Sequence, residues 1–147
     1  MVKNFSKEPR KEGITDDEWI WKKNMKIGMW NLRSLFWSGA LKVLHYVLSN
    51  LDVDIVALQE IQFESGIQKF DNFTVFNSGS GSKKHEFGGG FYVRGEFLKY
   101  VEDFKIITER ISCLRLKAKR VSCTLINVHA PTNKKNGKRK KKNFVIY

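Results

Sequence analysis

The pattern of apolar and polar residues predicts strands and a helix arranged around one short, buried strand. Residues 54–60, Asp-Ile-Val-Ala-Leu-Gln-Glu, hold four consecutive apolar side chains between polar ones, which is typical of a buried strand. Residues 26–31 alternate weakly and predict an earlier strand. Between the two, apolar residues recur at helical spacing over residues 39–50, with Ser38 as the N-cap. These apolar residues are Ala40, Leu41, Leu44, Val47, Leu48 and Leu51. A strand–helix–strand unit of this kind favours a parallel or mixed sheet covered by a helix.

Shorter strands are predicted along the rest of the chain. They are residues 73–76, 88–93, 111–116 and 121–129. The last two strands are expected to pair around a turn at residues 117–120. The final strand is expected to be central in its sheet because it is mostly apolar, and Pro131 ends it. Residues 61–69 predict a loop, and the Gly/Ser-rich residues 77–82 predict a flexible one. Residues 96–108 fit either a short helix or a strand.

Positive charge is concentrated at the carboxyl end of this 147-residue chain. The formal net charge is +12, of which residues 133–147 contribute +7 with no acidic residue. Residues 25–132 carry +4, and residues 1–24 carry +1. We therefore expect a polar amino-terminal extension, one domain over residues 25–132 and a Lys-rich tail. The tail suits nucleic-acid binding or nuclear import, and a solvated end without a role is the alternative.

Composition excludes several classes of protein. With 41% hydrophobic residues, the chain can bury a core. No apolar run is long enough for a membrane span, and residues 1–24 lack the apolar region of a secretory signal, so we expect a nuclear or cytoplasmic protein. Cys113 and Cys123 are expected as buried thiols, although a hairpin could bring them together. The glycines at 88–90 do not form a phosphate-binding loop, because the Lys that such a loop requires does not follow them. We also expect no small-molecule cofactor.

Three polar residues follow predicted apolar strands: Asn31, Glu60 and His129. Each has an ordinary alternative, since Asn31 suits a turn, Glu60 suits a strand end at the surface and His129 suits a surface or core position. If the strand ends converge on one edge of a sandwich, the three residues would suit metal-assisted phosphodiester cleavage. Glu60 would then hold Mg²⁺, and Asn31 and His129 would hydrogen-bond the phosphate or the attacking water.

Five short motifs occur in the order of one known family. They are Met29–Ser34, Leu58–Glu60, Gly89–Val93, Glu109–Ile111 and Leu125–Thr132. Together they resemble the amino-terminal half of the endonuclease domain of non-LTR retrotransposons and its domesticated relatives, among them the craniofacial development protein 2-like proteins. These belong to the endonuclease/exonuclease/phosphatase superfamily. The resemblance implies an α/β (α+β) fold, an incomplete four-layered α/β sandwich with mixed sheets whose carboxyl-terminal half is missing. It also implies Mg²⁺ as the cofactor and DNA as the partner.

The same resemblance assigns roles to residues and shows where this chain departs from the family. Glu60 takes the place of the metal ligand, Asn31 that of the active-site Asn, and His129 stands where many relatives have Tyr. The Asp/Asn and Asp/His motifs of the family's second half do not occur after Thr132, where no carboxylate follows. We therefore expect a fragment of a Mg²⁺-dependent DNA endonuclease that is inactive alone. One face of its sheet should be uncovered, or completed by a partner chain.

Two other interpretations stay open. The chain would be a non-catalytic nucleic-acid-binding module if its basic residues bind phosphates. It would be a non-functional remnant if the missing half of the core leaves the fold unstable. The candidate phosphate contacts are Arg33, Lys83, Lys84, Lys134, Lys135, Lys138, Arg139 and Lys140.

Overall fold

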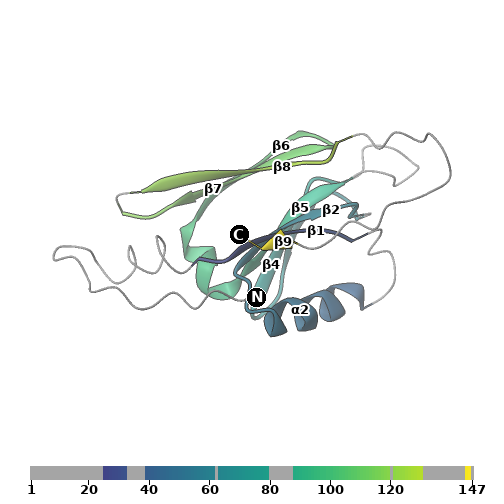
Figure 1. The fold of residues 1–147 in the computed structure, drawn as a ribbon. Coiled ribbons are helices and arrows are strands. Elements are labelled where there is room, and N and C mark those ends of the chain that lie inside the picture. The colour runs from purple at the N-terminus through teal and green to yellow at the C-terminus, as the bar shows by residue number, and fades with distance from the viewer. Residues whose placement is uncertain are drawn as a thin grey trace.

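Two sheets pack face to face, and helix α2 (Ala40–Asn50) lies on the outer side of the larger sheet (Figure 1). The computed structural model describes residues 25–32, 39–61, 63–79, 88–119, 121–130 and 145–146. Within these residues the fold is α+β, with one mixed six-stranded sheet and one antiparallel three-stranded sheet. The predicted combination of helix and mixed sheet is confirmed at this level.

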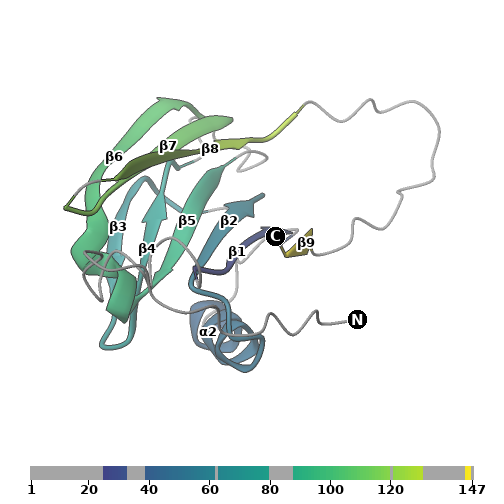
Figure 2. The ribbon, with the colours of Figure 1, turned by 60° about the vertical axis from the view of Figure 1, so that its left-hand side comes forward.

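The larger sheet has the strand order β3-β4-β5-β2-β1-β9, which can be followed by the labels in Figure 2. Its strands are β1 (Ile27–Asn31), β2 (Ile55–Gln59), β3 (Gly66–Lys69), β4 (Phe73–Asn77), β5 (Gly89–Arg94) and β9 (Val145–Ile146). The smaller sheet has the order β6-β7-β8, and its strands are β6 (Val101–Thr108), β7 (Ile111–Lys117) and β8 (Ser122–Val128). The helical elements are α2 (Ala40–Asn50) and the 3-10 helix η1 (Gly95–Tyr100).

The predicted strand–helix–strand unit is confirmed by β1, α2 and β2. The two strands are parallel and pair in register, from Ile27 beside Ile55 to Asn31 beside Gln59. Helix α2 provides the crossover that a parallel pair requires. The carboxyl ends of β1 and β2 therefore lie side by side at one edge of the larger sheet.

Helix α2 buries the centre of its predicted apolar stripe, Ala40, Leu44 and Leu48. The stripe prediction is wrong for Leu51, which is 43% exposed at the C-cap, beyond the last helical turn. The predicted start is also wrong, because the helix begins at Ala40 and Gly39 occupies the N-cap with a left-handed φ of 86°. Ser38, the expected cap, lies outside the described residues.

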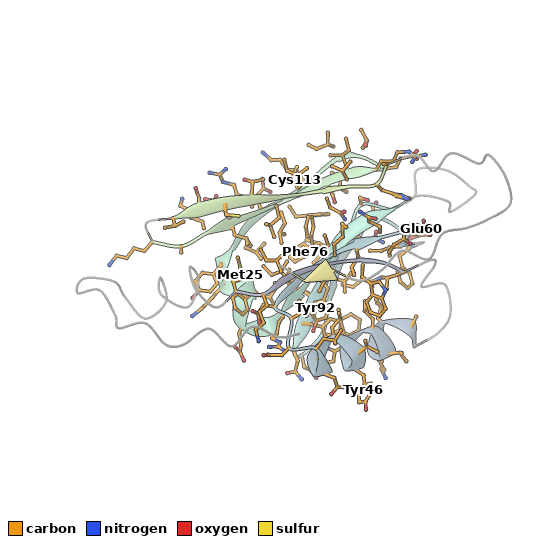
Figure 3. The ribbon with its side chains drawn as sticks, viewed as in Figure 1. Met25, Tyr46, Glu60, Phe76, Tyr92 and Cys113 are labelled. Carbon is orange, nitrogen blue, oxygen red and sulfur yellow. The ribbon has the colours of Figure 1, made fainter. Side chains whose placement is uncertain are left out.

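Strand β2 is buried on both faces, which explains its unbroken apolar run. Val56 and Leu58 pack in the core beneath α2, whereas Ile55 packs in the core between the two sheets. Figure 3 shows the same division, with Tyr92 of β5 on the side of α2 and Phe76 of β4 between the sheets. Each fully buried aliphatic side chain contributes roughly 1.5–3 kcal/mol, so β2 stabilises both layers.

The glycine run lets β5 enter a crowded position between β2 and β4. A Cβ atom on Gly90 would lie 2.0 Å from the carbonyl oxygen of Phe76, and one on Gly88 would lie 2.1 Å from that of Ile61. Both distances are far shorter than a van der Waals contact, so no larger residue fits there. The structural role predicted for these glycines is confirmed.

The prediction of a loop over residues 61–69 is wrong for its second half. Residues 66–69 form β3, which pairs with β4 at the edge of the larger sheet. Ile67 is 53% exposed there, so β3 buries no regular set of apolar side chains. The pattern of such an edge strand cannot be distinguished from that of a loop.

The flexible loop predicted at residues 77–82 is wrong for its first three residues. Asn77 ends β4, and Asn77, Ser78 and Gly79 are buried. The Asn77 carboxamide donates to the carbonyl oxygen of Glu64 at 2.8 Å, and the Ser78 hydroxyl donates to that of Gly89 at 2.7 Å. These bonds satisfy polar side chains inside the fold. Residues 80–82 lie outside the described residues.

The antiparallel pairing of β7 with β8 confirms the predicted hairpin. The prediction that its second strand is central is wrong, because among the described residues β7 is central and β8 is an edge. The apolar side chains that suggested burial, Ile126 and Val128, are 63% and 52% exposed on the outer face of the smaller sheet. That an incomplete sandwich leaves one face of its sheet uncovered stays a prediction.

Both alternatives for residues 96–108 are present in part, since the 3-10 helix η1 leads into β6. Cys113 and Cys123 are free and half-buried. They do not face each other, because Cys113 pairs with Ile126 and Cys123 pairs with Leu116. Burial raises the pKa of the Cys123 thiol. Within the described residues, no helix has the length and apolar character that a membrane crossing requires.

Candidate active site

The three predicted site residues meet at one edge of the molecule. Asn31 is the last residue of β1, Glu60 follows β2, and His129 follows β8. Because β1 and β2 are parallel, their carboxyl ends reach the same edge of the larger sheet. Strand β8 reaches that edge from the facing layer, and Figure 3 shows Glu60 there. The structure thus brings together residues from two sheets that are up to 98 positions apart in the printed sequence.

The Glu60 carboxylate lies between the other two side chains. Asn31 Nδ2 donates a hydrogen bond to Glu60 Oε1 at 2.8 Å. His129 Nε2 lies 3.6 Å from the same oxygen, within reach of an ion pair when the imidazole is protonated. The His129 side chain is 4% exposed and that of Glu60 is 27% exposed. The carboxylate is therefore oriented by the partly buried Asn31 and faces the buried His129, and it is still accessible to a ligand.

The backbone of Glu60 adopts a left-handed conformation, with a φ of 59°. Glutamate is not among the residues enriched in this region, and the conformation costs about 1–2 kcal/mol. Hydrogen bonds on both sides hold it, since Leu32 N–H donates to the Gln59 carbonyl at 3.0 Å and Ile61 N–H donates to the Gly88 carbonyl at 3.1 Å. Strain of this kind, stabilised by its surroundings, is typical of functional positions.

The donor atoms at this edge fit a weakly held Mg²⁺ ion. Mg²⁺ is commonly bound by one or two carboxylates, with water and substrate phosphate completing its octahedral shell. Glu60 supplies one carboxylate, and its partly exposed oxygens leave room for such ligands. Among the described residues, no group of three or more His, Cys, Asp or Glu side chains gathers to form a complete metal cage. Zinc, which prefers three or four protein ligands, fits less well.

The predicted phosphate contacts fall outside the described residues. They are Arg33, Lys83, Lys84, Lys134, Lys135, Lys138, Arg139 and Lys140. Their role in binding nucleic acid stays a prediction.

Two buried carboxamides that the sequence analysis did not single out lie directly beneath the cluster. Gln59 precedes Glu60 and is 7% exposed, and Asn127 lies two residues before His129 and is 3% exposed. Gln59 ends the apolar run of β2, and Asn127 lies between Ile126 and Val128 in β8. A buried polar side chain must find hydrogen-bond partners, and this requirement is the signal that could have identified them.

Ion pairs surround the carboxylates at the opposite end of β2. Arg94 Nη1 lies 3.1 Å from Asp52 Oδ1 and 3.3 Å from Asp54 Oδ1, and Lys26 also pairs with Asp52. The backbone N–H of Lys26 donates to Asp54 Oδ2 at 2.8 Å. Hydrogen bonds from Lys26 and Arg94 lower the pKa of Asp52, whereas burial raises the pKa of Asp54. This end is a neutralised structural cluster.

Comparison of the chain with models of known protein families, and with the sequences of curated proteins, finds no match. The geometry of the site and the sequence motifs therefore carry the functional argument.

Proposed function

We propose that this chain carries the amino-terminal half of a Mg²⁺-dependent phosphodiesterase site of the endonuclease/exonuclease/phosphatase type, that its substrate is DNA, and that the chain alone does not cleave it. The observation that supports this proposal is the position of Glu60 between Asn31 and His129 at the ends of strands from two facing sheets. The α+β fold with a mixed sheet is compatible with such a domain.

Each of the three residues has a distinct task in this proposal. Magnesium on Glu60 would supply positive charge that stabilises the phosphate and the leaving oxygen. Asn31 holds the Glu60 carboxylate in one orientation through its 2.8 Å hydrogen bond. His129, fixed by a 2.9 Å bond from its backbone N–H to the Arg110 carbonyl, can donate from its imidazole to a phosphate oxygen.

By the resemblance, the base for the attacking water would come from the family's Asp/Asn and Asp/His motifs, which do not occur in this sequence. Hydrolysis requires a group that removes a proton from water within hydrogen-bond distance. The carboxylates Asp52 and Asp54 lie at the far end of β2 and pair with Arg94. No Asp or Glu follows Glu109 in the sequence. In this proposal the base would come from outside the cluster of Asn31, Glu60 and His129.

A nicking assay on supercoiled plasmid tests this proposal. The chain is incubated with Mg²⁺ or with a chelator, beside Glu60→Gln, which keeps the size of the side chain and removes its charge. We expect no nicking above background in any sample. Mg²⁺-dependent nicking that disappears in Glu60→Gln would show that the site is complete and would contradict the inactive half-site. Nicking that persists in Glu60→Gln would come from a contaminant.

A non-catalytic nucleic-acid-binding module is the second candidate, favoured by the charge of the tail. Replacing Lys138, Lys140, Lys141 and Lys142 by Gln removes four charges and retains β9, which pairs with β1. The matched control removes four exposed lysines of the folded part: Lys42, Lys69, Lys105 and Lys119. If the tail binds duplex DNA, the tail variant should reduce the slope of log K against log salt concentration by about 3.6. Equal effects of both variants would contradict a specific role of the tail.

A further inference from the structure

We propose that Gln59 and Asn127 are positioning residues, a carboxamide clamp between the two sheets that sets the separation of Glu60 and His129. The inference rests on the proposed function for its purpose, but its geometry is independent of any metal. Gln59 comes directly before Glu60, and Asn127 lies in β8, two residues before His129. A bond made by either carboxamide therefore fixes the backbone that carries a site residue.

Asn127 reaches from β8 into the larger sheet. Its Nδ2 donates to the carbonyl oxygen of Leu58 at 2.7 Å and to that of Gly90 at 3.0 Å. Leu58 belongs to β2 and Gly90 to β5, so one carboxamide bridges two adjacent strands of the facing sheet. Both N–H donors of Asn127 are used, as a buried carboxamide requires.

Gln59 makes the reciprocal connection from β2 to β8. Its Nε2 donates to the carbonyl oxygen of Val128 at 3.0 Å and lies 3.4 Å from Asn127 Oδ1. The acceptor Val128 is the residue before His129. The two carboxamides thus form one network, and its members lie 68 positions apart in the sequence.

This network specifies a register that apolar packing alone does not. Apolar contacts between facing sheets are non-directional and tolerate small displacements. The clamp requires the β8 carboxamide to meet two particular carbonyl oxygens of the larger sheet, and sliding β8 by one residue would bury those donors without acceptors. Gln59 and Val128, which this network joins, directly precede Glu60 and His129. The network therefore sets the 3.6 Å separation of Glu60 Oε1 and His129 Nε2.

Gly89 makes room for the clamp. A Cβ atom at this position would lie 3.1 Å from Asn127 Nδ2 and 3.6 Å from the Leu58 carbonyl oxygen. The first distance is too short for an unstrained contact, so an alanine would push the Asn127 carboxamide aside without removing it. Gly95 provides a matched control, because a Cβ atom there would lie 3.1 Å from the Asn72 carbonyl oxygen, away from the site.

Metal-free NMR spectra of the full chain test the positioning role. The reporters are the side-chain amide of Asn31, which donates to Glu60, and the ring C–H signals of His129. We expect Gly89→Ala and Asn127→Leu to move both sets of signals, and Gly95→Ala to leave them in place. Unmoved reporters in folded Gly89→Ala protein would overturn the clamp, as would equal movement in Gly95→Ala. Gly89→Ala keeps the test decisive if Asn127→Leu does not fold.

Binding of Mn²⁺, a substitute for Mg²⁺ that is followed by line broadening, links the clamp to the site. Loss of a residue that orients a metal ligand typically weakens metal affinity by about 10–100-fold. We therefore expect the Kd for Mn²⁺ to rise at least tenfold in Gly89→Ala and to stay unchanged in Gly95→Ala. An unchanged Kd in Gly89→Ala would overturn the positioning role. Absence of Glu60-dependent Mn²⁺ binding in the unaltered chain would instead overturn the proposed function, and the metal-free spectra would still decide the clamp.

Discussion

The two ends of β2 carry acidic residues in the same unusual backbone conformation but in opposite surroundings. Asp52, before the strand, has a φ of 51°, and Glu60, after it, has a φ of 59°. Asp52 follows the C-cap of α2, where a left-handed residue commonly ends a helix. Glu60 ends no helix, and its conformation turns the carboxylate out of β2 towards Asn31 and His129.

Among the described residues, Lys and Arg side chains neutralise the amino end of β2 but not its carboxyl end. Arg94 pairs with both Asp52 and Asp54 at the amino end of β2. At the carboxyl end, no Lys or Arg of the described residues forms an ion pair with Glu60. A carboxylate that pairs with no Lys or Arg can bind a metal ion, whereas a carboxylate that pairs with a guanidinium group stabilises the fold. The partners of a carboxylate, more than its place at a strand end, distinguish a site from a structural cluster.

The largest effect should come from removing the cation at the structural end. Arg94→Met leaves the Asp54 carboxylate, whose side chain is 8% exposed, without its cation. We expect the free energy of unfolding to fall by about 2–3 kcal/mol at pH 7, measured by urea unfolding. The double variant Arg94→Met/Asp54→Asn no longer has the buried charge, so its free energy of unfolding should be higher than that of Arg94→Met. A double variant no more stable than Arg94→Met would contradict this explanation.

The same variant has a defined pH dependence. Burial raises the pKa of Asp54 above its ordinary 3.8, so the folded protein holds this proton more tightly than the unfolded chain. As the pH rises from the ordinary carboxyl pKa through the raised pKa of the folded state, ionisation of Asp54 therefore lowers the free energy of unfolding. Arg94 offsets part of this loss of stability. The deficit of Arg94→Met should be largest at neutral pH and should shrink below the ordinary carboxyl pKa. A deficit that does not change with pH would assign the effect to lost packing of the Arg94 side chain.

A glycine substitution at each end should separate strain from function. Glu60→Gly relieves the left-handed backbone, and we expect it to raise the free energy of unfolding by up to about 1 kcal/mol and to abolish any response to Mg²⁺. Asp52→Gly relieves the same strain but loses exposed ion pairs, so its stability should change little and its Mg²⁺ response should persist. Thermal unfolding of both variants makes the comparison. A loss of more than 1 kcal/mol in Glu60→Gly would mean that Glu60 serves the fold.

The smallest effect is expected for Lys26→Met. Lys26 and Asp52 are 50% and 65% exposed, so their ion pair should contribute less than about 0.5 kcal/mol and weaken in high salt. The hydrogen bond from Lys26 lowers the pKa of Asp52, and its contribution is therefore present above the ordinary value of 3.8 and lost as the pH falls through the lowered pKa. Urea unfolding at two salt concentrations measures it. An effect as large as that of Arg94→Met would contradict the division between buried and exposed pairs.

Much of the larger sheet could be predicted because its strands carry strong burial patterns. The unbroken apolar run of β2 and the helical stripe of α2 favoured a parallel or mixed sheet covered by a helix. The parallel pairing in the structure places Asn31 beside Gln59. β3 was missed because an exposed edge strand has no such pattern. The apolar residues Ile126 and Val128 suggested a central strand, yet periodicity reports which side chains are apolar and not which strand has neighbours on both sides.

The candidate site was predictable only in part. Polar residues at strand ends identified Asn31, Glu60 and His129, because strand ends can converge on one edge. The contacts of Gln59 with Asn127 and Val128 were not predictable, because they join strands of different sheets that are distant in sequence. The left-handed conformation of Glu60 likewise depends on hydrogen bonds from Leu32 and Ile61 on either side of it. Such features follow from tertiary arrangement, which a single sequence does not display.

Thermal unfolding of the full chain and of Glu60→Gln, each with and without Mg²⁺, tests the central claim most directly. Ligand that binds only the folded state stabilises it by about 1.4 kcal/mol at ten times its Kd, which raises Tm by a few degrees. The half-site predicts an upward shift with Mg²⁺ in the unaltered chain and no shift in Glu60→Gln. An equal response in both proteins, or no response in either over a wide range of Mg²⁺ concentrations, would contradict a metal site at Glu60.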